Sequence, residues 1–350
     1  MESMSAISSS FGPRPRDELA AWTTAPLADR ELAPIPGYAE PSPPGRVHLV
    51  GGAGVYVRRT GGPDRPHAWY IHGLEGASGN WDRLAAALST QATGFAPDLP
   101  GSGRSDPPPS GRYSLTAEAD LVARLIEDVS GQPVHLVGNS RGGVVATFLA
   151  ARHPQLVRTL TLISPAVPDL RLVGERGADP RLALVMLPGM LGAAERRLAA
   201  VGSADRARGM AAACFGEPDM LTADDLLAAE QEFARRAGLP WTRVATIRSL
   251  RSLIRAQLRL GRFSFAAAAR SVRVPVLVVW GARDRLVDVR LAPRTADHFA
   301  DARLLVLART GHVAQMERPA DTARAMVAMW GGEPPSAGAP LPSMARPVAT

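Results

Sequence analysis

A serine, an aspartate and a histidine each follow an apolar run, and together they could carry out nucleophilic chemistry. Ser140 lies in a G-x-S-x-G motif at 138–142, directly after the apolar run 134–137, and Asp284 and His312 each follow a later run. A serine hydroxyl becomes a strong nucleophile when a histidine takes its proton and a carboxylate orients that histidine. The spacing therefore predicts a site in which these three side chains meet, in the chain order Ser, Asp, His.

The surroundings of Ser140 predict a sharp turn from a strand into a helix. Its flanking glycines, Gly138 and Gly142, would leave room where a Cβ would collide with the neighbouring strand and helix. Such a turn places the hydroxyl at the N-terminus of the following helix. Backbone N–H groups and the positive helix end favour developing negative charge there.

The elements that must position these residues alternate between strand and helix. Apolar runs that lack polar alternation predict strands buried on both faces, as in a mostly parallel sheet with helical crossovers. The expected fold class is therefore α/β, with a mostly parallel twisted sheet flanked by helices. The expected strands are 47–50, 55–59, 68–72, 93–97, 134–137, 159–163, 276–280 and 304–307, and the expected flanking helices are 80–88, 116–130, 141–153 and 320–329.

One long interval, residues 165–270, interrupts this alternation with helical patterns at 181–191, 223–237 and 244–260. Ligands of open α/β sheets bind at the carboxyl ends of the strands, where such an insertion would sit. We therefore expect a helical lid. The predicted division of the chain is an N-terminal extension at 1–45, an α/β core at 46–164 and 271–330, the lid at 165–270, and a disordered tail at 331–350.

Composition excludes several classes of protein. The chain has 350 residues and a net charge of +7, but its 40 basic residues are all arginines and are scattered among 33 acidic ones, so we do not expect nucleic-acid binding. No apolar run is long enough to span a membrane, and the N-terminus has no apolar signal core, so a cytoplasmic location is expected. The single cysteine, Cys214, is expected to be a buried structural residue and rules out a cysteine-based metal site.

The motifs taken in order resemble those of the α/β-hydrolase superfamily across residues 46–330. They are the Tyr-Ile-His-Gly run at 70–73, the run at 98–105, the serine turn, Gly281-x-x-Asp284, and Gly311-His312. The resemblance implies that Ser140 is the nucleophile, His312 the general base and then acid, and Asp284 the orienting carboxylate. It also implies an oxyanion hole built from the backbone N–H groups of Leu74 and Arg141. No metal or organic cofactor is implied.

Other titratable residues compete for these roles. Asp288 and Asp169 are alternatives to Asp284 as the orienting acid. His72 could serve as a base, but in the pattern of the superfamily the residue at its position structures the oxyanion loop.

Two side chains depart from the pattern, Glu75 after the first oxyanion position and Arg141 after the nucleophile. One hypothesis is that these two residues lie close enough to pair, and that one of them meets a polar group of the substrate. The interpretation that we favour is that both point to solvent or to unrelated partners. Trp241, with Met186, Met190, Phe215 and Phe233, is a candidate to line the substrate site from the lid.

These features predict a serine hydrolase that cleaves a carboxylic ester, or a related acyl bond, of a small and largely apolar molecule. The serine turn at 138–142, or nucleophile elbow, and the stretch 76–81 are also similar to those of C–C bond hydrolases of meta-cleavage products. Arg141, however, replaces a methionine typical there. A serine at the elbow argues against dehalogenase or epoxide hydrolase activity, which uses aspartate. A binding protein without turnover is the alternative of another class, and the sequence leaves the oligomeric state open.

Overall fold

The computed structural model describes residues 22–62, 65–169 and 190–331. Most of the expected helix at 181–191, with Met186, lies outside these ranges, as does residue 332 onward.

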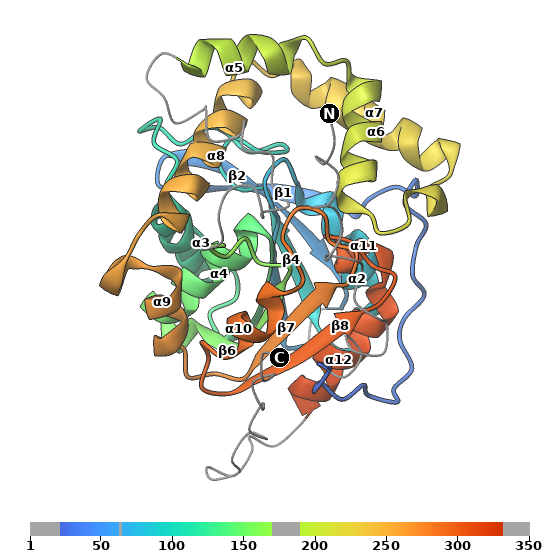
Figure 1. Ribbon diagram of the computed structural model, residues 1–350, viewed down its shortest axis with the longest axis vertical. Helices are drawn as coiled ribbons and strands as arrows, with labels where there is room; N and C mark the ends of the chain where they lie inside the picture. Colours follow the sequence, from blue (N-terminus) through green and yellow to red (C-terminus); the bar gives the residue numbers. More distant parts are fainter. Residues whose placement is uncertain (1–21, 63–64, 170–189, 332–350) are drawn as a thin grey trace, which may run out of the picture.

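The strands form one eight-stranded sheet in the order β1-β2-β4-β3-β5-β6-β7-β8 (Figure 1). Only β2 runs against its neighbours, and every other adjacent pair from β4 to β8 is parallel. The expected mostly parallel sheet is confirmed, and each expected strand is present. The strands are β1 (Gly45–Val50), β2 (Ala53–Thr60), β3 (His67–Ile71), β4 (Thr93–Pro97), β5 (Val134–Asn139), β6 (Val157–Ile163), β7 (Val276–Gly281) and β8 (Ala302–Leu307).

Helices cover both faces of the sheet and bury a separate apolar cluster on each. Along β3, Trp69 and Ile71 enter one cluster while Ala68 and Tyr70 enter the other, because side chains alternate across a strand. The first face carries α3 (Leu115–Val129), α4 (Arg141–Arg152), α9 (Phe265–Ser271) and α10 (Leu291–Ala296). The second carries α2 (Asp82–Ala87), α11 (Ala314–Glu317) and α12 (Pro319–Gly331).

A helical insertion separates β6 from β7 and stands above the end of the sheet where the site residues lie (Figure 1). Its helices are α5 (Met190–Ala199), α6 (Ser203–Cys214), α7 (Ala223–Ala237) and α8 (Thr242–Gln257). Thr222 caps α7 by accepting a hydrogen bond from the Asp225 N–H at 3.2 Å, while the Asp225 carboxylate accepts from the Thr222 N–H. Among the described residues, no helix is long and apolar enough to cross a membrane.

The turn from β5 into α4 is possible because two positions lack a Cβ. A Cβ at Gly142 would stand 2.6 Å from the carbonyl oxygen of His72 and closer still to that of Ile71. A Cβ at Gly138 would stand 2.7 Å from the carbonyl carbon of Gly142. Gly142 therefore lets the start of α4 pack on the end of β3, and Gly138 lets the end of β5 lie against the start of α4.

Replacing Gly142 should therefore damage the fold. We expect Gly142→Ala to lower the free energy of unfolding by about 3 kcal/mol or more, because backbone atoms of β3 would have to move. Gly209→Ala is the matched control, since that glycine lies in α6 with nothing within 4 Å of a Cβ, and it should gain about 0.5–1 kcal/mol. Chemical denaturation measures both, and equal stabilities for the two variants would contradict the packing argument.

Candidate active site

Ser140 occupies the turn after β5 in a conformation that side chains rarely adopt, with φ 53° and ψ −120°. Four backbone hydrogen bonds hold it there: its N–H donates to Ile163 O at 3.0 Å, and its carbonyl accepts from the N–H groups of Gly143, Ala166 and Val144 at 3.0, 3.1 and 3.4 Å. Such strain persists when the surrounding structure over-determines it, and it is concentrated at functional sites. The side chain stays partly exposed at the end of the sheet.

His312 and Asp284 lie together at the ends of the neighbouring strands β8 and β7. His312 Nδ1 is 2.8 Å from Asp284 Oδ2, and the Asp284 side chain is fully buried. The other carboxylate oxygen accepts from the N–H groups of Leu286 and Val287 at 2.9 and 3.0 Å. The carboxylate is thus fixed from both sides. The competing Asp288 forms an ion pair with Arg290 instead.

No hydrogen bond joins the Ser140 hydroxyl to His312 among the residues that the structure describes. The link between them runs through the neighbour of the serine. Asn139 donates from Nδ2 to the carbonyl oxygens of Ile163 and His312, both at 3.0 Å. Contacts between a nucleophile and its base often tighten only when substrate is bound.

The loop that carries His312 is fastened to the helical insertion. The His312 N–H donates to Cys214 O at 2.6 Å. Glu317 accepts from the N–H of Gly216 with one oxygen and from that of Gly311 with the other, each at 2.7 Å. Cys214 is buried as expected, and burial raises the pKa of its thiol to about 12. The insertion therefore helps to place the histidine.

His72 is a structural residue of the loop after β3. Its Nε2 accepts from the Leu99 N–H at 2.9 Å, so Nδ1 carries the proton and donates to Gly73 O at 2.8 Å. Burial lowers the pKa of His72 to about 4, outweighing the nearby carboxylate of Asp98. The neutral ring thus joins the loops that follow β3 and β4. A Cβ on Gly73 would lie 3.2 Å from the Ser140 Cβ, so this loop lies against the nucleophile.

The hypothesis that Glu75 and Arg141 pair is wrong, and each side chain has an unrelated partner, as the favoured alternative predicted. Glu75 forms an ion pair with Arg206 of α6, and Arg141 forms one with the buried Glu118 of α3. The reason is burial: Arg141 is 1% exposed and points toward α3, where only a carboxylate can balance its charge. Burial raises the pKa of Glu118, and Arg141 opposes that shift.

Sequence reasoning missed the arginines that bind the oxyanion loop from the insertion. Arg236 of α7 donates from Nη1 to Glu75 O at 2.7 Å and to Gly76 O at 3.4 Å. The guanidinium carbons of Arg206 and Arg236 lie 5.1 and 5.0 Å from the ring centroid of Phe233. Glu75 itself has φ 57°, so these contacts hold a strained residue beside Leu74. The unusual glutamate in the loop was the only signal in the sequence.

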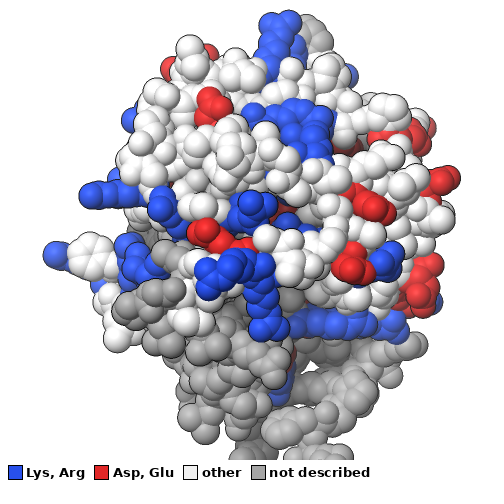
Figure 2. Space-filling model, turned by 90° about the horizontal axis from the view of Figure 1, so that it is seen from above, with Lys and Arg blue, Asp and Glu red and all other residues white. Residues whose placement is uncertain are grey.

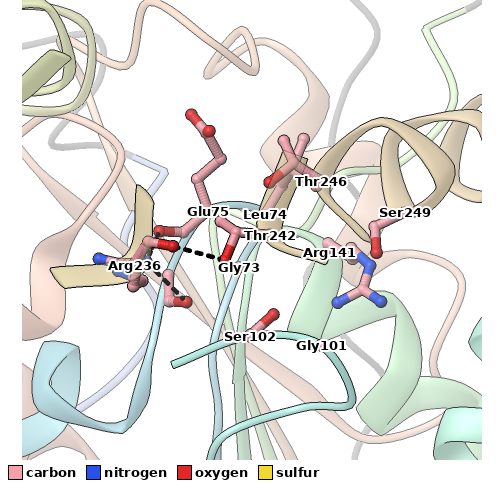
Figure 3. A pocket seen from close by; sticks show the side chains of 11 residues that line it. Gly73, Leu74, Glu75, Gly101, Ser102, Arg141, Arg236, Thr242, Thr246 and Ser249 are labelled. Carbon is pink, nitrogen blue, oxygen red and sulfur yellow. Dashed lines mark hydrogen bonds between the residues drawn. The ribbon is translucent and has the colours of Figure 1, made fainter. Parts of the chain in front are cut away.

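A hollow of about 330 Å³, partly open to solvent, lies between this loop and α8 (Figure 3). Both expected oxyanion positions, Leu74 and Arg141, line it. The remaining lining is mostly polar, which differs from the apolar substrate expected from the sequence. The full lining consists of Gly73, Leu74, Glu75, Gly76, Gly101, Ser102, Arg141, Arg236, Thr242, Thr246 and Ser249.

The aromatic residues expected to line the site are not among these residues. Trp241 directly precedes α8, and its buried Nε1 has no hydrogen-bond partner. Phe215 packs with Cys214 and Val313, and Phe233 lies between the two arginines.

The outer face of the insertion carries charges of both signs. Figure 2 looks onto it from above and shows arginines and acidic residues interspersed, not a single basic tract. In the part of the chain that the structure describes, no group of three or more His, Cys, Asp or Glu side chains is placed to hold a metal ion.

Comparison with known proteins agrees with this architecture. The family model for the alpha/beta hydrolase fold matches residues 70–319. The chain is 24% identical over 284 residues to a monoacylglycerol lipase of Xenopus laevis, covering 77% of each protein. It is 27% identical over 245 residues to 2-hydroxymuconate semialdehyde hydrolase of Pseudomonas sp. strain CF600, covering 69% of this chain and 77% of that one.

A solved structure shares the fold at lower identity. It is the 2-hydroxy-6-oxo-6-phenylhexa-2,4-dienoate hydrolase of Rhodococcus sp. strain RHA1, with a TM-score of 0.65 and 21% identity, covering 82% of this chain and 98% of that one. The chain belongs to the α/β-hydrolase fold family. It is a hydrolase.

The neutral state of His72 predicts a loss of stability in acid. The folded protein keeps His72 neutral down to about pH 4, whereas the unfolded chain takes up that proton near pH 6.5. This contribution is complete above pH 6.5 and is lost as the pH falls toward 4, by on the order of 3 kcal/mol. Denaturation at a series of pH values should show a flatter profile for His72→Asn than for the wild type. Parallel profiles would refute the assignment.

The ion pair between Glu75 and Arg206 should stabilise the protein measurably. Both side chains are largely buried, at 18% and 11% exposed. A double-mutant cycle with Glu75→Gln and Arg206→Met should give a coupling of about 1–2 kcal/mol in denaturation. The matched cycle is the exposed pair Asp205 and Arg208 on the same helix, where less than about 0.5 kcal/mol is expected. Equal couplings would mean that the first pair does not secure the loop.

Proposed function

We propose that the protein is a serine hydrolase that cleaves a carboxylic ester through an acyl-enzyme. The observation that carries this proposal is the placement of a strained, partly exposed Ser140 at the same sheet edge as the hydrogen-bonded pair of His312 and Asp284. Asn139 ties the serine turn to the histidine loop. This arrangement has the parts that acyl transfer requires: a nucleophile, a base and a group that orients the base.

The proposed cycle has two halves. His312 takes the proton of Ser140 as its Oγ bonds to the carbonyl carbon of the ester. The N–H groups of Leu74 and Arg141 stabilise the resulting oxyanion. His312 then gives its proton to the leaving alcohol as the C–O bond breaks. In the second half it takes a proton from water as the water oxygen bonds to the acyl carbon. It then returns that proton to Ser140 Oγ as the acyl–Oγ bond breaks and the acid is released.

Asp284 would act through the histidine. Its hydrogen bond at 2.8 Å fixes His312 with the proton on Nδ1, so that Nε2 is free to accept the serine proton. The two backbone N–H groups on the other carboxylate oxygen keep Asp284 from turning away. The insertion would act as a lid, because it covers the strand ends and supports both the histidine loop and the oxyanion loop.

A second candidate is hydrolysis of a C–C bond in a meta-cleavage product. The similarity to the Pseudomonas semialdehyde hydrolase and the elbow sequence support it. A panel of short p-nitrophenyl esters, thioesters and a vinylogous diketone separates the two reactions. Turnover of the diketone at a higher kcat/KM than any ester would favour the second candidate.

Substitution of the nucleophile should abolish activity. We expect Ser140→Ala to lower kcat/KM for p-nitrophenyl butyrate roughly 10⁴-fold or more, because no other group supplies the attacking oxygen. Ser164→Ala is the matched control. Ser164 also follows a parallel strand with positive φ, at 42°, but it is fully buried and should not react.

Labelling with a fluorophosphonate reports on the same serine without a substrate. The wild type and Ser164→Ala should be labelled, and Ser140→Ala should not. A folded wild-type protein that takes up no label would point to a binding protein without turnover.

A further inference from the structure

The hollow beside the oxyanion loop offers hydrogen-bond donors where an acyl pocket would be expected to offer apolar surface. Leu74 supplies the only apolar side chain among its lining residues. Arg141 and Arg236 line it, together with residues that carry hydroxyl groups (Figure 3). Its volume includes open solvent, and the space that a water-sized group can occupy is about 20 Å³, so the group it accepts is very small.

One face of α8 presents a row of hydroxyls to this hollow. Thr242, Thr246 and Ser249 are spaced i, i+4 and i+7, which places them above one another on the helix. Thr242 and Ser249 are 9% and 5% exposed, so this polar row is turned inward. The Thr242 hydroxyl donates to Arg236 O at 2.8 Å, which leaves Thr246 and Ser249 to meet a ligand.

Arg141 has hydrogen-bonding capacity that the protein does not use. It is 1% exposed, its Nη2 is bound to Glu118, and its buried Nε has no partner. Glu118 is not among the lining residues, so it supports the guanidinium from outside the hollow. The carboxylate of Glu75, which does line the hollow, is already bound by Arg206. A buried donor without an acceptor is costly, and a ligand oxygen would satisfy it.

The hollow also adjoins the expected donors to the oxyanion. Leu74 and Arg141 line it, and their backbone N–H groups are the proposed donors to the ester oxyanion. A group in the hollow must therefore be joined to the reacting carbonyl by only a few atoms. An apolar acyl chain there would leave the Nε of Arg141 unpaired, whereas a carboxylate accepts from a guanidinium and hydroxyls at once.

We propose that this hollow binds a carboxylate at the far end of the acyl group, so that the preferred substrates are monoesters of short dicarboxylic acids. This inference rests on the proposed ester hydrolysis at Ser140. Arg141 would supply both a backbone donor to the oxyanion and a side-chain donor to the carboxylate, with Thr246 and Ser249 completing the subsite.

The first test compares two esters of equal chain length, p-nitrophenyl hydrogen glutarate and p-nitrophenyl valerate, after subtraction of the spontaneous rates. We expect kcat/KM of the wild type to be at least about tenfold higher for the glutarate, the size of one charge-assisted hydrogen bond. Equal rates, or a preference for the valerate, would overturn the proposal.

Variants then test which residues cause the preference for the glutarate ester. Arg141→Met combined with Glu118→Met removes the ion pair without leaving a lone buried charge, and should bring the glutarate-to-valerate ratio to within about twofold of unity. Because the ratio is taken within one variant, a loss that affects both esters cancels. Thr246→Val keeps the ion pair and the side-chain shape, and should lower the ratio at least about threefold even where the double variant does not fold.

Arg255→Met is the control for general electrostatic attraction. Arg255 is an exposed arginine on α8 that is not among the lining residues, so its loss should leave the ratio unchanged. An unchanged ratio in the folded double variant or in Thr246→Val would overturn the subsite. A fall in Arg255→Met as large as in the double variant would do the same.

Failure of the ester chemistry can be told apart from failure of the subsite. Labelling of Ser140 and turnover of the valerate test the proposed function alone. Calorimetry with free glutarate and free valerate on Ser140→Ala tests the subsite alone. We expect glutarate to bind at least about tenfold more tightly, and equal affinities would overturn the subsite whatever the catalytic result.

Discussion

The backbone of Ser140 bends at a point where an extended strand must become a helix within one residue, and much of the site depends on that bend. A residue at φ 53° costs on the order of 1–3 kcal/mol, so the surrounding contacts must offset it. Close packing of Gly138 and Gly142 against backbone, and the hydrogen bond to Ile163, supply these contacts. The same close approach brings the loop after β3 against the serine. That loop, which carries Leu74, is therefore positioned by the geometry of the turn.

The sheet could be predicted well from the sequence because its strands are short apolar runs with little polar alternation. Such runs have few alternatives to a sheet buried on both faces. The meeting of Asp284 with His312 was predictable for the same reason, since the two residues end strands that proved to be neighbours. Short helices such as α10 (Leu291–Ala296) lacked a strong apolar period and were missed.

The side-chain partners in the site were less predictable. Glu75 is 131 residues from Arg206, and the pairing depends on how α6 packs above the sheet. Arg141 is bound by Glu118, which belongs to the apolar stripe of α3 and had no motif of its own. One signal was present but unused: the spacing of Thr242, Thr246 and Ser249 puts hydroxyls on one helical face. From the sequence we instead expect Trp241, Phe215 and Phe233 as lining residues, and none of them lines the hollow.

The helical insertion is not a separable cover on the core, because its residues bind the two loops that carry His312 and Leu74. Glu317 accepts hydrogen bonds from the N–H groups of both Gly216 and Gly311. The carbonyl oxygen of Cys214 accepts from the N–H of His312. Arg236 donates to a carbonyl oxygen of the loop after β3. Exchanging this segment for that of a relative would remove supports from both halves of the site at once. In this protein, exchange of the whole insertion is thus a poor route to new substrate specificity. Single substitutions on the inner face of α8 leave those hydrogen bonds in place and are a better route.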